Sequence, residues 1–302
     1  MATLPLRIEC RADSEPWVIE QRMFDTLNDF LQPSSQMTSA QAAQGLNDCF
    51  PLHRADDDGI VEQDGEESKG EEPESFLWEM WDLVVRVAQQ VPYKHPSQDK
   101  LAELVKALRD LNSGTRVDIW GIERKLWEDL PLLHQQILET GNTFNLQELH
   151  TNEEKRERWQ SFIAFIARLT SDKTQPEPIF AIWALRYALE EEPDSRARAY
   201  HTQGPTLDAQ MPAAVEWILV SGRVLYESCQ SSDKDERADY DATKGGRNFK
   251  GQGLSLERWK FWKQRFAQIQ LFDQVREATK VLAKEAVEEM EAIEREANVQ
   301  KV

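Results

Sequence analysis

The sequence predicts an all-α protein, an irregular multi-helix bundle with a central apolar helix and a long C-terminal helix. Three observations support this class. From Glu15 onward, apolar residues recur every three or four positions, which is the spacing of one helix face. Runs of alternating apolar and polar residues, which are typical of strands, are scarce. Several segments also begin with a Ser or Thr of the kind that caps helix N-termini.

The amino-acid composition indicates which classes of partner to expect. The 302 residues carry a formal net charge of −18, so the surface repels phosphate groups. Nucleic acids and anionic membranes are bound mainly through Lys and Arg, and we therefore expect neither as a partner. Ten tryptophans and twelve phenylalanines supply enough large apolar side chains for a folded core.

The cysteines and the first residues indicate the compartment. Cys10, Cys49 and Cys229 lie far apart and form no C-x-x-C pair, which favours a reducing compartment over a disulfide framework or a zinc cluster. The first residues lack the continuous apolar stretch of a signal peptide, and no window approaches the ~18 apolar residues that span a bilayer. We expect a cytoplasmic or nuclear protein without membrane insertion.

Residues 1–54 are predicted to form an N-terminal helical segment that packs on the main domain. Its first helix has Ser14 as N-cap and Pro16 in the first turn. Thr38 with Gln41 forms a capping box for the second helix.

Residues 55–74 are almost entirely acidic, glycine or small polar residues. Such a segment has no apolar surface to offset the cost of ordering its backbone, and we expect an acidic disordered loop. A docking tail for a basic partner is the functional alternative.

Residues 75–275 form the predicted main domain. Apolar stripes at helical spacing mark successive helices over 77–91 and 101–111. The segment after them is predicted to be a shorter helix that carries Ile119, Ile122 and Leu126. Another helix runs over 131–141, from a proline to a glycine.

The second half of the main domain contains the predicted central helix. Residues 179–189 have apolar side chains in nearly every direction, as a helix surrounded by other helices does. A Thr151–Glu154 capping box opens the helix before it, and another helix begins around Pro212. Residues 230–253 are polar, charged and glycine-containing, which favours a flexible loop.

Ser255 is the predicted N-cap of a long final helix. Its first half carries large aromatic residues at helical spacing and is expected to dock on the core. In the charged extension 276–302 the aromatic residues disappear among many glutamates. This second half is expected to project, fray or meet a partner helix.

Three phrases in the chain are distinctive in their order and wording: FLWEMWDLVVRVAQQVPYKHPSQDKLAELVKALRDL, LWEDLPLL and LERWKFWKQRF. Together they resemble a family of ascomycete (filamentous-fungal) helical proteins that carry a domain of unknown function. The resemblance covers roughly residues 74–275. It implies an intracellular all-helical domain and supplies no established catalytic residues. It says little about the N-terminal portion or the acidic loop.

The sequence contains no complete catalytic or cofactor template. Metal-binding helices place histidines four residues apart, a spacing that is absent among His53, His95, His134, His150 and His201. The run GGRNFKGQG has the glycine separation of a P-loop, but Gln252 and Gly253 stand where Lys and Ser or Thr would hold phosphate and magnesium. These absences favour a protein that is not an enzyme and that carries no cofactor or metal.

Tryptophans three residues apart form the first candidate ligand site. Trp78 and Trp81 have the spacing to line an aromatic pocket between helices, as do Trp259 and Trp262. Aromatic residues at this spacing are more often part of the core, with the indole N–H bonded to a carbonyl or to water. For Trp78 and Trp81, both the pocket interpretation and the core interpretation stay open.

The second candidate is VPYKHPSQDK, over residues 91–100, which is dense in titratable side chains. Its two prolines predict a hinge between helices. In this interpretation His95 is the N-cap, Gln98 reaches back to its N–H as in a capping box, and Asp99 complements the helix dipole. Tyr93 would cover the end of the helix pair.

The functional alternative treats the same stretch as a binding site. Tyr93, His95 and Asp99 would then converge with a distant acid, Glu79 or Asp82, on a small polar ligand.

The leading hypothesis for function is a non-enzymatic helical interaction or scaffold module with a protein partner. Its grounds are the missing catalytic templates, the large aromatic stripes and the charged flexible segments. The alternative is a binder of, or an enzyme acting on, a small hydrophobic molecule in an aromatic-lined pocket between helices. The oligomeric state is open, because a final helix packed on its own bundle or on a second copy has the same apolar pattern.

Overall fold

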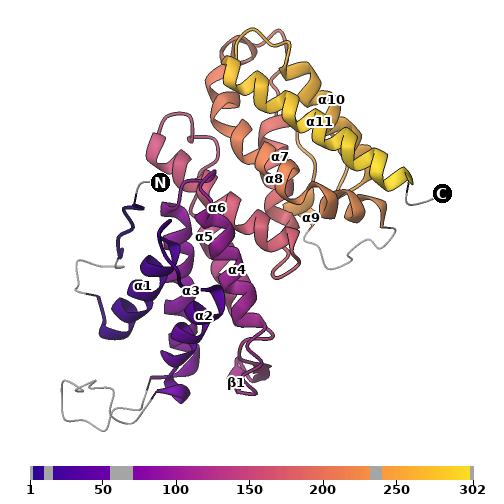
Figure 1. Cartoon of the computed structure of the whole chain (residues 1–302). Coiled ribbons are helices and arrows are strands. Elements are labelled where there is room, and N and C mark those ends of the chain that lie inside the picture. Colours follow the sequence, from indigo (N-terminus) through magenta and orange to yellow (C-terminus); the bar gives the residue numbers. More distant parts are fainter. Residues whose placement is uncertain (1–2, 10–15, 55–70, 232–239, 300–302) are drawn as a thin grey trace. The chain divides into compact units, whose positions relative to one another are not determined.

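The computed structural model describes residues 3–9, 16–54, 71–231 and 240–299 (Figure 1). It confirms the all-α class, because helices account for most of the described chain and a two-stranded sheet is its small β element. The chain divides into two compact units, Met1–Thr143 (unit 1) and Phe144–Val302 (unit 2). The predicted domain boundaries at residues 54, 74 and 275 stay predictions. Most of the predicted acidic loop, residues 55–70, lies outside the described residues.

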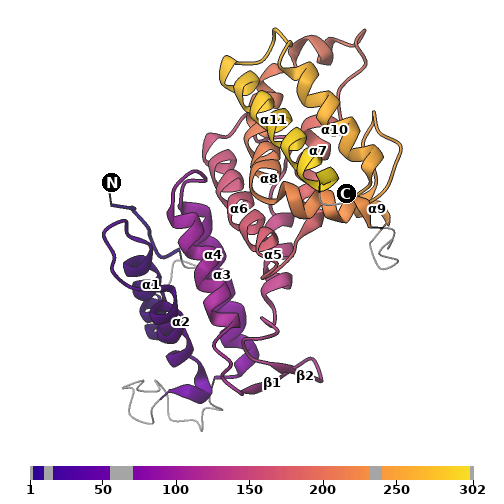
Figure 2. The same cartoon turned by 45° about the vertical axis from the view of Figure 1, so that its right-hand side comes forward.

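Unit 1 contains the following elements in chain order, visible in Figures 1 and 2: α1 (Val18–Leu31), α2 (Ser39–Asp48), the 3-10 turn η1 (Pro51–His53), α3 (Pro73–Gln90), α4 (Ser97–Arg109), β1 (Arg116–Ile119), β2 (Ile122–Lys125) and α5 (Leu133–Asn142). The helix α3 packs against α1, α5, β1 and η1, and α4 packs against α2 and α1. Edge-to-face aromatic contacts, the arrangement that ring quadrupoles favour, fill the core between Phe50, Phe76, Trp81 and Trp127.

A side-chain cap marks the beginning of α2 but not that of α1. The predicted capping box of α2 is confirmed, because Thr38 accepts from the N–H of Gln41 while the Gln41 side chain accepts from the N–H of Thr38. The predicted start of α1 is wrong. Trp17 has an extended backbone, so the helix begins at Val18 and Pro16 precedes it. The predicted N-cap, Ser14, lies outside the described residues.

The short helix predicted over 119–126 is wrong, because this stretch is an antiparallel β-hairpin. Ile119 of β1 pairs with Ile122 of β2, and the two residues between them form the turn. Trp120 and Gly121 both have positive φ angles, 57° and 77°, which a helix cannot contain and which a two-residue hairpin turn requires. The next helix, α5, begins at Leu133, after a left-handed backbone at Leu132.

Unit 2 contains α6 (Glu153–Ser171), α7 (Pro178–Leu189), the 3-10 helix η2 (Arg198–Thr202), α8 (Gly204–Gln230), α9 (Tyr240–Thr243), α10 (Leu256–Ile269) and α11 (Glu277–Val299). The apolar helix α7 packs against α6, α8, α9 and α10, in keeping with its predicted central position. The predicted capping box of α6 is wrong. Asn152 caps this helix by accepting from Lys155 N–H, and Thr151 bonds instead to the carbonyl of Glu148.

The long helix α8 packs against α6, α7, α10 and α11. It begins at Gly204, well before its predicted start, and Pro212 lies inside it. A glycine is required at the beginning because a Cβ on Gly204 would lie 2.0 Å from the carbonyl oxygen of Gln274. The connection between α10 and α11 therefore passes directly over the start of α8.

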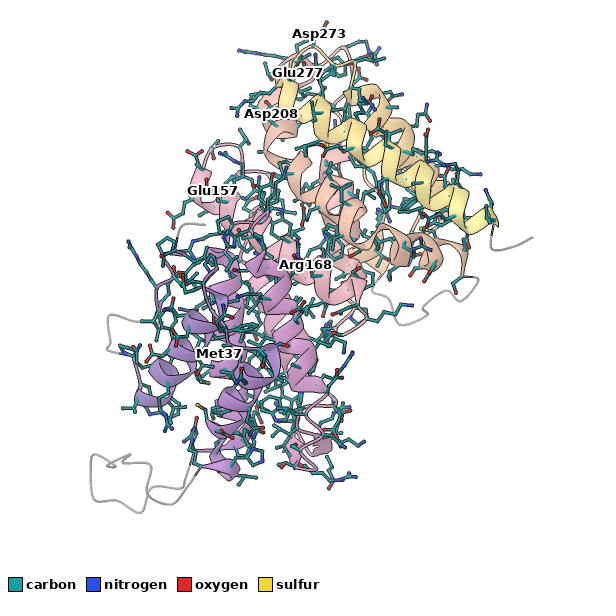
Figure 3. The ribbon with its side chains drawn as sticks, viewed as in Figure 1. Met37, Glu157, Arg168, Asp208, Asp273 and Glu277 are labelled. Carbon is teal, nitrogen blue, oxygen red and sulfur yellow. The ribbon has the colours of Figure 1, made fainter. Side chains whose placement is uncertain are left out.

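The predicted single final helix is two helices. Ser255 caps α10 as predicted, by accepting from Arg258 N–H. The later helix α11 packs against α8 and α10 instead of projecting. Asp208 of α8 caps it, because its Oδ1 accepts from the N–H of Arg276 and from the hydroxyl of Thr279. Figure 3 shows Asp208 near Glu277, at the end of unit 2 where α11 begins.

The predicted flexible loop 230–253 is partly folded. Residues 232–239 lie outside the described residues. Beyond them the chain forms α9 and then returns on itself through a bridge between Lys244 and Gln252. Thr243 and Phe249 are buried, so this part belongs to the core of unit 2.

Candidate functional site

The hinge over residues 91–100 joins helix ends in unit 1. The amide of Gln98 is fully buried and donates to the carbonyls of Ala88 (3.2 Å) and Val91 (2.7 Å), which lie at the end of α3. Helix ends leave such carbonyls without intrahelical partners, and Gln98 satisfies them. The predicted bond from Gln98 back to His95 is therefore wrong, since the N–H of His95 donates to Pro92 O.

The same hinge also ends α1. Ser97 donates its hydroxyl to the carbonyl of Leu31 at 2.5 Å. The ammonium of Lys100 donates to the carbonyls of Phe30 and Gln32, at 3.0 Å each. A cation at a helix C-terminus also complements the negative end of the helix dipole.

His95 has a capping role. Its Nδ1 accepts from the backbone N–H of Ser97 at 3.1 Å. The predicted N-cap position of His95 is wrong, because α4 begins at Ser97 and Pro96 is its N-cap. Tyr93 is half-buried and has the ammonium of Lys94 5.5 Å from its ring centre. Asp99 is exposed in the first turn of α4. The hinge residues thus serve helix ends, and a ligand role for Tyr93, His95 and Asp99 stays a prediction.

Of the two acids that were candidates to complete this site, Asp82 has partners on α3 and α5. Asp82 forms an ion pair with Arg86 (2.7 Å) and accepts from the amide of Gln136 on α5 (2.8 Å). Glu79 raises the pKa of Glu20, for which burial is the larger cause. A convergence of either acid with Tyr93, His95 and Asp99 stays a prediction.

Trp81 belongs to the core. It is fully buried, its indole N–H donates to Pro131 O at 2.8 Å, and its ring meets Trp127 edge to face. Trp78, one turn earlier in α3, is half-buried. The second pair follows the same rule, because the indole N–H groups of Trp259 and Trp262 donate to glutamates. A ligand role for Trp78 and Trp81 stays a prediction.

The hairpin β1–β2 of unit 1 carries two exposed large apolar side chains close together. Its base is anchored by Thr115, whose carbonyl accepts from Leu126 N–H and whose hydroxyl contacts Nε2 of His53 at 2.8 Å. Val117 and Ile119 are buried on the side of α3. The hairpin is therefore fixed at its base and along one face.

The tip of this hairpin presents two large apolar side chains to solvent. Trp120 is 60% exposed and Ile122 is 52% exposed. The indole N–H of Trp120 donates to Glu74 at 2.9 Å, which orients the ring against the beginning of α3. We call Trp120 and Ile122 the hairpin tip.

The backbone at the hairpin tip is costly for a tryptophan. A non-glycine residue in the left-handed region costs about 1–2 kcal/mol, and Asn is the usual residue at this turn position. Asp118 supports the turn by accepting from Gly121 N–H at 2.9 Å. Turn formation alone therefore does not explain why a tryptophan occupies position 120.

Polar and charged groups occupy the rest of the hairpin surface and limit pairing of its outer edge with another strand. Asp129 accepts from the N–H of Lys125 and donates its own N–H to Lys125 O, which blocks that end of the outer edge. Arg116 and Glu123 form an ion pair across the strands. The apolar contact surface is thus confined to the hairpin tip.

A buried ion pair in unit 2 holds the segment over residues 243–253, at and after the end of α9. The side chains of Glu190 and Arg258 are both 0% exposed and pair at 2.7 Å. Glu190 also accepts from the indole of Trp262 (2.6 Å) and from Gly246 N–H (2.7 Å). Arg258 donates to backbone carbonyls of the glycine-containing segment, including that of Thr243 (2.9 Å). Buried charges need such complete pairing, and here it fixes the segment over 243–253.

Sequence reasoning missed three of these residues. Trp120 was placed on a helix, although the β-branched residues at 115, 117 and 119 alternate as they do in a strand. Arg258 lies inside a phrase that carried the family resemblance, and its burial could not be read. Glu190 begins a run of three glutamates that looks like a solvated surface.

Burial shifts the pKa of two further groups. Burial raises the pKa of the Cys229 thiol to about 12, which keeps it protonated and unreactive near neutral pH. Burial also raises the pKa of Glu71, although its ion pair with Arg54 opposes the shift. Within the described ranges, no three His, Cys, Asp or Glu side chains gather as metal ligands would. None of the described helices has the length and apolarity needed to cross a membrane.

Comparison with known proteins identifies the domain but not its activity. A family model described as "Protein of unknown function (DUF3632)" matches residues 81–266, a span that contains the hinge, the hairpin and the buried ion pair. No curated protein and no solved structure matches the chain. Because the model covers more than half of the 302 residues, the chain belongs to the DUF3632 family of proteins of unknown function.

Proposed function

We propose that this protein is a non-enzymatic interaction module that binds another polypeptide through the hairpin tip. The observation that carries the proposal is the exposure of Trp120 and Ile122 at the end of an anchored hairpin, with Trp120 in a backbone conformation that disfavours it. A residue kept at a cost to folding has its use elsewhere.

The chemistry of the hairpin tip favours a protein partner with an apolar pocket. Tryptophan is enriched among the residues that contribute most to protein interfaces, because one rigid side chain buries a large area. The hairpin is already ordered by its contacts with His53 and α3, so little conformational entropy is lost on binding. The indole N–H is satisfied by Glu74, which leaves the ring face for contact.

The test separates binding from folding. Trp120→Asn places in the turn a residue that tolerates the left-handed backbone, so the free energy of unfolding should stay equal or rise by up to about 1 kcal/mol. Proteins that co-purify with the tagged wild type should be lost with Trp120→Asn and with Ile122→Asn. The matched control is Leu271→Asn, because Leu271 is 83% exposed but lies in unit 2.

Direct binding completes this test. A partner identified by its loss from both hairpin variants is then purified and titrated by calorimetry. We expect at least a tenfold weaker affinity for Trp120→Asn and an unchanged affinity for Leu271→Asn. Equal capture by the wild type and Trp120→Asn, with both folded, would contradict the proposal.

The fungal origin of the family and the subcellular location of the protein are also part of the proposal. The three phrases named above support a filamentous-fungal family, and three widely spaced cysteines without a C-x-x-C pair support a reducing compartment such as the cytoplasm or nucleus. Subcellular imaging of a tagged chain in its source cells tests the location.

The alternative function, binding of a small hydrophobic molecule, has one observation in its favour. The indole N–H of Trp217 is fully buried in unit 2 and has no hydrogen-bond partner within the described residues. A buried donor of this kind is satisfied by a water or by an acceptor atom of a ligand. A native mass spectrum separates the two functions, since a co-purified small molecule favours the alternative and a bound polypeptide favours the interaction module.

A further inference from the structure

The segment over residues 3–9 is an extended stretch held by two glutamine side chains of unit 1. Gln32, just after α1, accepts from the N–H of Leu4 (2.9 Å) and donates to its carbonyl (3.2 Å). Gln90, at the end of α3, does the same for Arg7, with distances of 2.8 and 2.9 Å. We call these two side chains the glutamine clamp.

The glutamine clamp recognises the main chain of the segment. A primary amide has one donor and one acceptor side by side, so it pairs with a peptide group as a neighbouring strand would. Each clamp residue therefore replaces one rung of a β-ladder. Arg86, one turn before Gln90 on α3, also donates to the backbone, at Glu9 O.

One side chain of the segment is anchored. Leu4 is 6% exposed, whereas Thr3, Pro5 and Arg7 are exposed. Sites for extended peptides have these two properties. Hydrogen bonds to the peptide backbone give affinity, and a pocket for a side chain gives selectivity.

The segment is suited to exchange. It forms no helix or strand of its own, and Gln32, Gln90 and Arg86 hold it through its backbone groups. The ion pair Arg54–Glu71 of unit 1 does not involve it. Releasing the segment therefore leaves the helices of unit 1 with their own contacts.

We infer that the glutamine clamp is a binding site for an extended polypeptide segment of a partner, and that residues 3–9 occupy it in cis. The partner segment would pair through its main chain with both glutamines and place a leucine-like side chain where Leu4 lies. This site is separate from the hairpin tip, so the proposed function and this inference can fail independently.

Tethering sets the expected concentration dependence. A segment on a short linker has an effective concentration on the order of mM, so it competes strongly with a peptide in solution. Release of the segment in cis should therefore strengthen binding of the same sequence in trans by tenfold or more.

The experiment uses the full chain and a fluorescent peptide with the sequence of residues 3–9, TLPLRIE. Leu4→Asp releases the segment, because a carboxylate is not tolerated in the buried position of Leu4. Fluorescence anisotropy should show binding to Leu4→Asp at least tenfold tighter than to the wild type. Adding Gln32→Ala and Gln90→Ala to Leu4→Asp should abolish this gain, whereas adding Gln44→Ala, an exposed glutamine of α2, should not.

A second measurement does not depend on the peptide. In the wild type, the amides of Leu4 and Arg7 should be protected from hydrogen exchange. Gln32→Ala should expose only the amide of Leu4, and Gln90→Ala only that of Arg7. The inference is overturned if folded Leu4→Asp binds the peptide no better than the wild type, or if the clamp variants leave both amides protected.

Discussion

At the scale of single residues, tryptophan shows how environment decides role. Trp81 is fully buried and its indole N–H is satisfied by a carbonyl, which is the common fate of an aromatic residue on a helix stripe. Trp120 has the same side chain but sits at a hairpin turn, exposed and in a disfavoured backbone. The first stabilises the fold, and the second is the residue on which the proposed function rests.

Arg258 gives the sharpest prediction for stability. Replacing it by Met leaves the Glu190 carboxylate buried without its cation, and breaking a buried pair in this way costs about 3–5 kcal/mol. Urea unfolding should show this loss for Arg258→Met. Arg223→Met, which removes a half-exposed partner of Glu296, should stay within about 0.5 kcal/mol of the wild type.

A double variant tests whether the lost stability comes from the unpaired charge. Glu190→Gln combined with Arg258→Met removes both charges and should recover part of the lost stability, because no uncompensated charge remains. A loss below about 1 kcal/mol for Arg258→Met would contradict a structural role for the pair.

At the scale of elements, the hinge over 91–100 stabilises the ends of several helices. Gln98 ends α3, Ser97 and Lys100 end α1, and His95 caps α4. One stretch of polar residues thus satisfies backbone groups from separate helices.

The hinge yields a ranking of two substitutions. His95→Ala removes one capping bond and should cost about 1 kcal/mol. Gln98→Ala leaves two buried carbonyls without their donor and should cost more, about 1–3 kcal/mol. Thermal unfolding of both variants, with exposed Lys94→Ala as control, measures the order. An unchanged stability of His95→Ala would remove the capping role and return His95 to the list of ligand candidates.

The hairpin shows how an element is misread from sequence. Apolar residues at 119, 122 and 126 have helical spacing, yet the strands use alternation and place 117 and 119 on the buried side. Each strand is only four residues long, so the same apolar residues fit both the spacing of a helix and the alternation of a strand. The left-handed turn at Trp120 decides between them, and no propensity rule anticipates a tryptophan there.

At the scale of the whole molecule, the chain consists of two units that each have a core. Unit 1 is organised around α3, and unit 2 around α8. Because each helix has packing partners in its own unit, we expect residues 1–143 and 144–302 to fold when expressed separately. Circular dichroism should show a cooperative thermal transition for each fragment. A fragment that melts without cooperativity would show that its core is incomplete.

The sequence by itself determined the features that arise from nearby residues. Helical periodicity and the capping groups of α2 and α10 act over about four residues, so the all-α class and the caps at Thr38 and Ser255 were predicted correctly. The three distinctive phrases indicated a domain of unknown function over roughly residues 74–275, and the family model matches 81–266.

Only the tertiary structure decided the features that join distant residues. Glu190 and Arg258 are 68 positions apart, and Gln90 lies 83 positions from the backbone that it holds. The docking of α11 depends in the same way on Asp208, which is 71 positions from Thr279. Such pairs leave no periodic trace in the sequence, because their energy comes from desolvation and geometry that exist only once the chain has folded.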